Sequence, residues 1–142
     1  MTAQRDGKAR VLIVEDNELC RLSVSALLKC IGFDVVAVAD GESAIEALTD
    51  NPQDVSAVLL DVTLPGLSGA DAFKALKGIS ADLPIILTSG YGQSVIDEQF
   101  AGTTYDGFVP KPAPADWLNT VLKSVTAPVR ANNAGRTLEK AG

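Results

Sequence analysis

A single acidic residue closes a run of apolar side chains near the middle of the chain. The run Ala57–Leu60 contains only Ala, Val and Leu, and it stops at Asp61. A short, wholly apolar run is typical of a strand buried on both faces, so Asp61 is predicted to lie at the mouth of a strand. Pro65, Gly66 and Gly69 then predict a loop, which leaves Asp61 facing a crevice. Taken alone, Asp61 fits a helix cap equally well, because Asp is a common helix starter.

Three other apolar runs also end in side chains that can do chemistry. These side chains are Glu15 and Asp16, Ser89, and Lys111. Crowded carboxylates repel one another, and a hard divalent cation such as Mg²⁺ relieves the repulsion through oxygen ligands. The Lys111 ammonium can contact both Asp61 and a phosphoryl oxygen, and the Ser89 hydroxyl can donate to another. Each residue alone has an ordinary structural explanation, but their shared position favours phosphoryl transfer to the Asp61 carboxylate, which is already ionised at neutral pH.

Strand and helix patterns alternate five times along the chain. Strands are predicted at 10–14, 34–39, 57–61, 83–89 and 107–110. Helices are predicted at 17–31, 44–50, 70–77, 94–101 and 115–125. This alternation predicts an α/β domain with one parallel sheet, covered on both sides by right-handed crossovers. Sheets of this kind keep their chemistry at the carboxyl ends of the strands, where the four groups above are placed.

The first and last helices carry apolar stripes that we expect to face the core. In the first helix the stripe is Cys20, Val24, Leu27 and Ile31, and in the last it is Trp117, Leu118, Val121, Leu122 and Val125. A second apolar cluster, Leu19, Leu22 and Ala26, lies about 130° around the first helix. This cluster fits a docking surface for the helical bundle of a phosphoryl donor, and it fits an ordinary broad core face equally well.

Composition narrows the class of protein. The chain has 142 residues, 46% of them hydrophobic, which is enough for one domain with a proper core. A net charge of −6 argues against a general electrostatic grip on nucleic acid or anionic membrane. The absence of an apolar secretory core and of a bilayer-length apolar stretch predicts a cytoplasmic protein. Cys20 and Cys30 are expected to be reduced core residues, and the absence of His excludes histidine catalysis and histidine metal ligands.

Taken together, these motifs resemble the receiver domain of two-component response regulators. The resemblance covers about residues 9–125, and residues 126–142 are expected to form a flexible C-terminal tail. It implies a doubly wound, three-layer, flavodoxin-like (βα)5 fold with a five-stranded parallel sheet in the order 2-1-3-4-5. The 17 residues after Val125 cannot form a DNA-binding domain, so we expect a stand-alone receiver without direct DNA binding.

The same resemblance assigns roles to individual residues. It implies that Asp61 is the phosphoacceptor and that Asp16, Asp61 and the backbone carbonyl of Thr63 hold Mg²⁺, with Glu15 acting through water. It further implies a cis peptide bond at Lys111–Pro112. It assigns Ser89 and Phe108 as a switch pair, in which the hydroxyl moves to the phosphoryl group and the ring follows inward, and it places Tyr91 on the face that changes. The chain departs from the family pattern at Thr103–Tyr105 and Pro110. These departures bear on the shape and mobility of the output face and not on the acceptor site.

The leading hypothesis is therefore a phosphorylation-controlled interaction switch or a phosphorelay intermediate. The phosphoryl donor would be a histidine kinase or a histidine phosphotransfer protein, because a chain without His cannot be its own donor. The output partner is unknown, and a weak homodimer through the fourth and fifth elements is compatible with the sequence. An aspartate-nucleophile phosphatase would need a second Asp where Thr63 stands, so we expect no enzyme activity beyond self-phosphorylation and slow hydrolysis. A flavin-binding protein and a phosphorylation-insensitive scaffold are the remaining alternatives.

Overall fold

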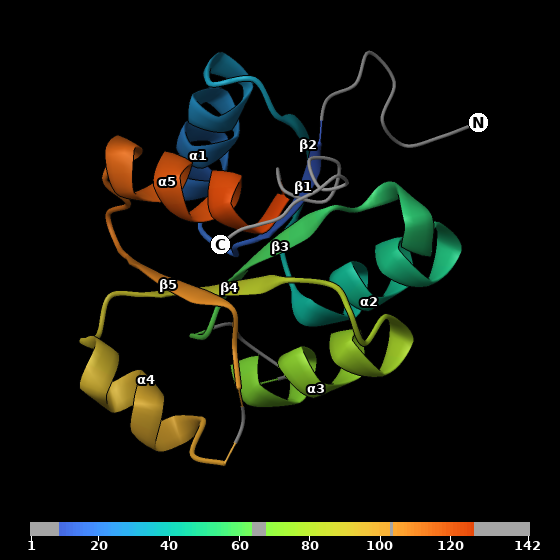
Figure 1. Cartoon of the computed structure of the whole chain (residues 1–142), viewed down its shortest axis with the longest axis vertical. Coiled ribbons are helices and arrows are strands. Elements are labelled where there is room, and N and C mark those ends of the chain that lie inside the picture. The colour runs from blue at the N-terminus through green and yellow to red at the C-terminus, as the bar shows by residue number, and fades with distance from the viewer. Residues whose placement is uncertain (1–8, 64–67, 103, 127–142) are drawn as a thin grey trace, which may run out of the picture.

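Five parallel strands form the centre of the molecule (Figure 1). This computed structural model describes residues 9–63, 68–102 and 104–126. The strands are β1 (Arg10–Val14), β2 (Asp34–Val38), β3 (Ala57–Asp61), β4 (Ile85–Ser89) and β5 (Gly107–Pro110). Their order is β2-β1-β3-β4-β5, so the predicted flavodoxin-like topology is confirmed.

Helices cover both faces of this sheet and make three layers (Figure 1). The α-helices are α1 (Glu18–Cys30), α2 (Gly41–Asp50), α3 (Gly69–Ile79), α4 (Gln93–Gln99) and α5 (Ala115–Thr126), and a short 3-10 helix, η2 (Pro52–Asp54), precedes β3. Helices α1 and α5 lie on one face, and α2, α3 and α4 lie on the other. No helix of the described residues is long and apolar enough to cross a bilayer.

The central strands are apolar throughout because both of their faces are buried. In β1, Leu12 and Val14 pack into the core layer beneath α2 and α3, whereas Val11 and Ile13 pack into the layer beneath α1 and α5. Side chains alternate between the two faces of a strand, so both layers need apolar residues from the same segment. This is why a continuous apolar run correctly predicted each buried strand.

Short polar side chains start three of the helices. Asn17 accepts a hydrogen bond from Cys20 N at 2.9 Å, and Asp40 and Ser68 accept equivalent bonds at the starts of α2 and α3. Each bond satisfies a backbone N–H that has no partner within its own helix. The cap of α1 places the loop of residues 15–17 directly beneath the first turn of that helix.

The predicted core face of α1 is confirmed for Val24, Leu27 and Ile31, which pack partly buried against the core beside the fully buried Leu28. Two other expectations about side-chain burial are corrected by the structure. Cys30 is exposed and is not a core residue. Trp117 is 45% exposed, whereas its helix α5 packs against the sheet through the buried residues Leu118 and Leu122.

Several predicted features lie outside the described residues. These are Pro65 and Gly66, Thr103, and the tail from residue 127 onward. The boundary placed after Val125 falls within α5, which ends at Thr126.

Candidate functional site

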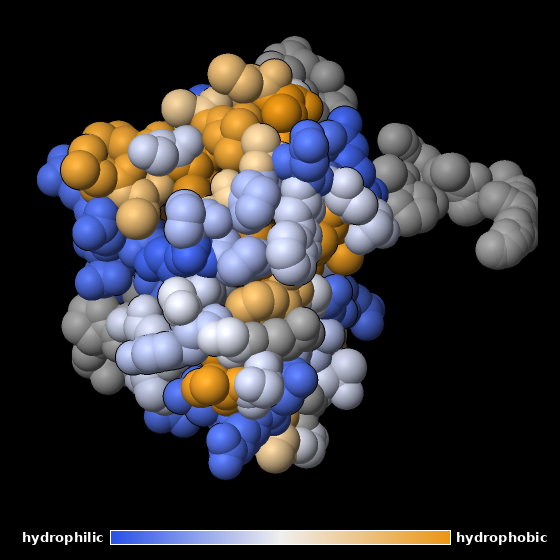
Figure 2. Space-filling model, turned by 90° about the vertical axis from the view of Figure 1, so that its left-hand side faces the viewer, coloured by the Kyte–Doolittle hydropathy of each residue, from blue (hydrophilic) through white to orange (hydrophobic). Residues whose placement is uncertain are grey.

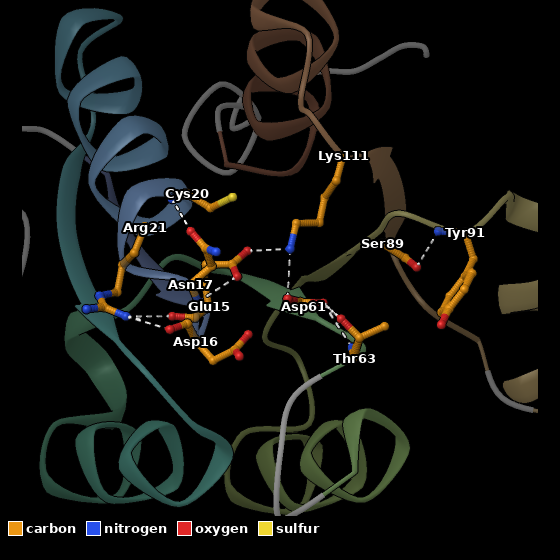
Figure 3. Close-up of polar contacts among 10 residues, drawn as sticks. All are labelled: Glu15, Asp16, Asn17, Cys20, Arg21, Asp61, Thr63, Ser89, Tyr91 and Lys111. Carbon is orange, nitrogen blue, oxygen red and sulfur yellow. Dashed lines mark hydrogen bonds and ion pairs between the residues drawn. The ribbon is translucent and has the colours of Figure 1, made fainter.

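Residues from three strand ends meet at the carboxyl edge of the sheet (Figure 3). Glu15 follows β1, Asp61 is the last residue of β3, and Lys111 follows β5. The parallel register places Val14 beside Leu60, so β1 and β3 end together. The predicted convergence of these groups is therefore present in the structure.

Asp61 is fully buried, and donors hold both of its carboxylate oxygens. Its Oδ1 accepts hydrogen bonds from Thr63 N at 2.9 Å and from Thr63 Oγ1 at 2.7 Å, and its Oδ2 accepts one from Lys111 Nζ at 3.0 Å. Burial raises the pKa of Asp61, but the bonds from Thr63 and Lys111 outweigh burial and hold that pKa below its ordinary value. Asp61 is consequently an ionised carboxylate at neutral pH and can act as a nucleophile.

Lys111 bridges the two buried acidic groups. Its Nζ lies 2.9 Å from Glu15 Oε1 as well as 3.0 Å from Asp61 Oδ2. Burial lowers the pKa of Lys111, but the two carboxylates outweigh burial and raise it above the ordinary lysine value. Burial raises the pKa of Glu15, and the bonds from Lys111 and from Asn17 N only partly offset that effect.

The site carries more negative charge than Lys111 can balance. Glu15, Asp16 and Asp61 each offer a carboxylate oxygen, and these three atoms all lie within 4.8 Å of one another. Glu15 and Asp61 are buried, whereas Asp16 is exposed and opens the cluster to solvent. Oxygen donors at this spacing, with one side open, are the chemistry that Mg²⁺ prefers when it shares its shell with water and phosphate. The donor set therefore fits the cation predicted from the sequence.

The proposed switch residues lie beside this cluster in different environments. Ser89 is buried at the end of β4, and its Oγ accepts a hydrogen bond from Tyr91 N at 2.9 Å. Phe108 is buried in the core layer of α2, α3 and α4, whereas Tyr91 is exposed. The Phe108 ring thus lies inward while Ser89 is bonded to the Tyr91 backbone, and the coupled movement of the two remains a prediction.

An apolar groove runs from the acidic cluster along α1. It encloses a cavity of about 260 Å³ between α1 and the segment after β5, and Glu15 and Lys111 line one end of it. Leu19 is 75% exposed and Leu22 is 58% exposed, so neither belongs to the core, and Ala26 is exposed as well. Figure 2 shows apolar surface gathered at the top of this side of the molecule, above a more hydrophilic band. The groove and the exposed leucines lie next to the charged site.

Sequence reasoning missed Arg21. Its Nη1 donates to the carbonyl oxygen of Glu15 at 2.9 Å and to that of Asp16 at 3.4 Å (Figure 3). An arginine near the start of a helix is ordinarily a solvated residue, and no spacing rule connects it to the peptide groups of the preceding loop.

The structure also confirms the cis peptide bond at Lys111–Pro112.

Comparison with known proteins agrees with this geometry. The family model of the response regulator receiver domain matches residues 11–123. The chemotaxis protein CheY of Bacillus subtilis is 38% identical over 110 residues, which are 75% of this chain and 88% of that protein. By contrast, the chain spans only 13% of the sensor kinase CckA of Brucella abortus, to which it is 29% identical, and 27% of a cyclic di-GMP phosphodiesterase of Thermotoga maritima, to which it is 33% identical.

Solved structures share the fold. A receiver domain protein from Clostridium thermocellum has a TM-score of 0.79 at 20% identity, with 87% of this chain and 98% of that chain covered. The receiver domain of a sensor histidine kinase from Pseudomonas aeruginosa PAO1, described with a magnesium ion in its active-site cleft, has a TM-score of 0.76 at 25% identity, with 84% and 98% covered. The match over almost all of the described domain, together with the acidic cluster and its lysine, shows that the chain belongs to the response regulator receiver domain family, the phosphoacceptors of two-component signalling.

Proposed function

We propose that Asp61 accepts a phosphoryl group from a phosphohistidine on a partner kinase or phosphotransfer protein. A carboxylate oxygen of Asp61 attacks phosphorus and forms the new O–P bond. The P–N bond breaks, and the imidazole leaves with the bonding electron pair. The observation that carries this assignment is the burial of the Asp61 carboxylate at the mouth of a strand, where Thr63 and Lys111 donate hydrogen bonds to its two oxygens.

The neighbouring side chains supply charge and hydrogen bonds to the transferred group. Lys111 lies 3.0 Å from Asp61 Oδ2, where its ammonium can balance a phosphoryl oxygen attached to that carboxylate. Ser89 Oγ accepts from Tyr91 N, so its own O–H can be donated to a second phosphoryl oxygen. Positioning and charge neutralisation are most of what phosphoryl transfer requires from a protein.

Glu15, Asp16 and Asp61, with the backbone carbonyl of Thr63, are the residues proposed to hold Mg²⁺, Glu15 through water. When bound, the cation would neutralise negative charge on the phosphoryl oxygens and on the acidic cluster. The chain's own part is to keep three carboxylate oxygens close together, at the cost of their mutual repulsion. Lys111 offsets some of that repulsion through its bonds to Glu15 and Asp61.

The phosphorylated chain is proposed to act as an interaction switch or relay intermediate in the cytoplasm, and not as an enzyme. Thr63 stands where an aspartate-nucleophile phosphatase needs a general acid, so the acyl phosphate should be hydrolysed slowly. The face expected to change carries Ser89, Tyr91 and Phe108, and the output partner is a protein.

The exposed apolar residues of α1 are proposed to dock the donor's helical bundle. Leu19 lines the groove that also contains Glu15 and Lys111, and Leu22 and Ala26 are exposed on the same helix, so a donor helix seated there would bring its phosphohistidine close to Asp61. Leu22→Asp should slow transfer from the donor while leaving folding and acetyl phosphate labelling unchanged. Val95→Asp on α4 is a matched control, because Val95 is also an exposed apolar residue on a helix. A large loss of stability in Leu22→Asp would contradict docking.

The direct test of the phosphoacceptor is incubation of the full chain with Mg²⁺ and acetyl phosphate, followed by intact mass measurement. One added phosphoryl group is expected, and it should be absent in Asp61→Asn and in the presence of chelator. Asp82→Asn makes the same chemical change at an exposed carboxylate and should leave labelling intact. Labelling that persists in Asp61→Asn would refute the assignment.

A further inference from the structure

An arginine forms hydrogen bonds with the backbone of Glu15 and Asp16, the acidic pair that follows β1. Arg21, in the first turns of α1, donates from one nitrogen to the carbonyl oxygens of both Glu15 and Asp16, at 2.9 Å and 3.4 Å. Figure 3 shows its guanidinium on the side of the loop opposite Asp61, while the Asp16 carboxylate points away from the guanidinium. A cation next to acidic residues can pair with their carboxylates, but these bonds go to peptide oxygens instead. The arginine therefore binds the backbone of the pair and leaves its side chains to face the site.

Backbone position matters most for Asp16. Glu15 is buried, its N–H donates to Val38 O at 3.1 Å, and its side chain contacts Lys111 and Asn17, so several contacts orient it. Asp16 is exposed, and surrounding packing does not set its direction in the same way. Two carbonyl groups bound by one nitrogen fix the two peptide planes that flank Asp16, and these planes set the direction of its Cα–Cβ bond.

We propose that Arg21 is a positioning residue that aims Glu15 and Asp16 at the cation site, an inference that rests on the proposed function of that site. Arg21 would contact neither the cation nor the phosphoryl group, and it acts only through the loop. Residues that orient ligands in this way have measurable effects on metal affinity.

The charge of Arg21 and its positioning role predict opposite changes in Mg²⁺ affinity when the arginine is replaced by a neutral residue. Its positive charge repels a divalent cation, so charge alone would make Mg²⁺ bind more tightly once the arginine is neutralised. Loss of the two carbonyl bonds would instead let the loop and the Asp16 side chain move, so that Mg²⁺ binds more weakly. The sign of the change in affinity therefore separates the two roles.

The experiment measures Mg²⁺ binding to the full chain by titration calorimetry, without any phosphoryl donor. We expect Arg21→Met to bind Mg²⁺ about tenfold more weakly, the lower end for a residue that orients ligands. Lys29→Met, which removes an equal charge from the last turn of the same helix, should bind as wild type does. Unchanged or tighter binding by Arg21→Met would overturn the proposal.

A second variant and a second readout cover the remaining outcomes. Arg21→Lys keeps the charge but shortens the side chain and loses the planar NH₂ group, so its affinity should lie between wild type and Arg21→Met. Should Arg21→Met fail to fold, wild-type affinity in Arg21→Lys would overturn the proposal.

The Mg²⁺ concentration for half-maximal acetyl phosphate labelling should rise with the dissociation constant, while the rate at saturating Mg²⁺ stays near wild type. Failure of the wild-type chain to bind Mg²⁺ would overturn the proposed metal site and this inference together, whereas binding that ignores Arg21 overturns this inference alone.

Discussion

The two ends of the sheet both carry a cation placed between two carboxylates, but the surroundings differ. At the carboxyl end, Lys111 bridges Glu15 and Asp61, whose side chains are 6% and 0% exposed. At the amino end, Arg10 lies 2.8 Å from Asp34 and 3.6 Å from Asp54, whose side chains are 41% and 30% exposed. In each cluster one cation contacts two carboxylates, but the two carboxylates at the carboxyl end are much less exposed to water than those at the amino end.

Exposure to water sets how strongly the carboxylates interact at each end of the sheet. The amino-end carboxylates are screened by solvent, so the repulsion between them is weak and their ion pairs contribute little. The buried carboxylates at the carboxyl end interact more strongly with each other and with Lys111, and Asp16 adds a third negative charge. A buried cluster whose carboxylates outnumber its cations favours binding of a further cation. A solvated cluster does so far less, because water already screens its charges.

The largest effect should come from Lys111→Met. This change leaves two buried carboxylates without their ammonium, and we expect a loss of about 3 kcal/mol in the free energy of unfolding, measured by urea denaturation in EDTA. Labelling of Asp61 by acetyl phosphate should slow by about 100-fold, because a donor to the phosphoryl group is lost. Lys74→Met, which removes an exposed lysine from α3, is the control. If Lys111→Met and Lys74→Met have the same free energy of unfolding, burial does not strengthen the ion pairs at the carboxyl end, and the contrast between the two ends of the sheet is wrong.

A smaller effect should come from Gly69→Ala, which tests how tightly the backbone packs at the carboxyl end. A Cβ at Gly69 would lie 2.6 Å from Val62 Cα and 2.7 Å from Val62 O, so the segment after Asp61 must shift. We expect a loss of about 2 kcal/mol, measured by thermal or urea unfolding.

Gly78→Ala is the matched control at the other end of the same helix, where a Cβ meets no atom within 4 Å. That variant should be neutral or gain up to about 1 kcal/mol from helix propensity. A stable Gly69→Ala protein with normal labelling would show that the contact with Val62 relaxes easily.

The smallest effect should come from Arg10→Met at the amino end. Partial exposure of Asp34 and Asp54 limits the expected loss to about 1 kcal/mol or less, and salt should reduce it further. Urea unfolding at low and high ionic strength measures both quantities. Labelling of Asp61 should be unchanged, because Arg10 lies at the opposite end of β1. A loss as large as that of Lys111→Met would show that exposure is not what separates the two clusters.

Much of the fold and of the site followed from local pattern. Each apolar run became a strand, because both faces of the inner strands are buried, and the strand ends carried Glu15, Asp61, Ser89 and Lys111 to one edge. The errors lie where burial depends on the neighbouring element. Trp117 belongs to the apolar pattern of α5 but is 45% exposed, and Cys30 of α1 is exposed as well. Helical periodicity shows which residues share a face, but it does not show how far the neighbouring layer reaches.

By itself, the sequence determined the order of elements, the two-sided burial of the strands and the set of groups at their ends, because these depend on side-chain polarity and on periods of two and 3.6 residues. Only the tertiary structure decided that Lys111 would bridge Glu15 and Asp61, that Leu19 and Leu22 would remain exposed, and that Arg21 would bind two peptide carbonyls. Such contacts depend on distances of a few ångström between residues that can be far apart in the sequence, as Lys111 and Asp61 are at a separation of 50 residues. Those distances arise only when the layers pack.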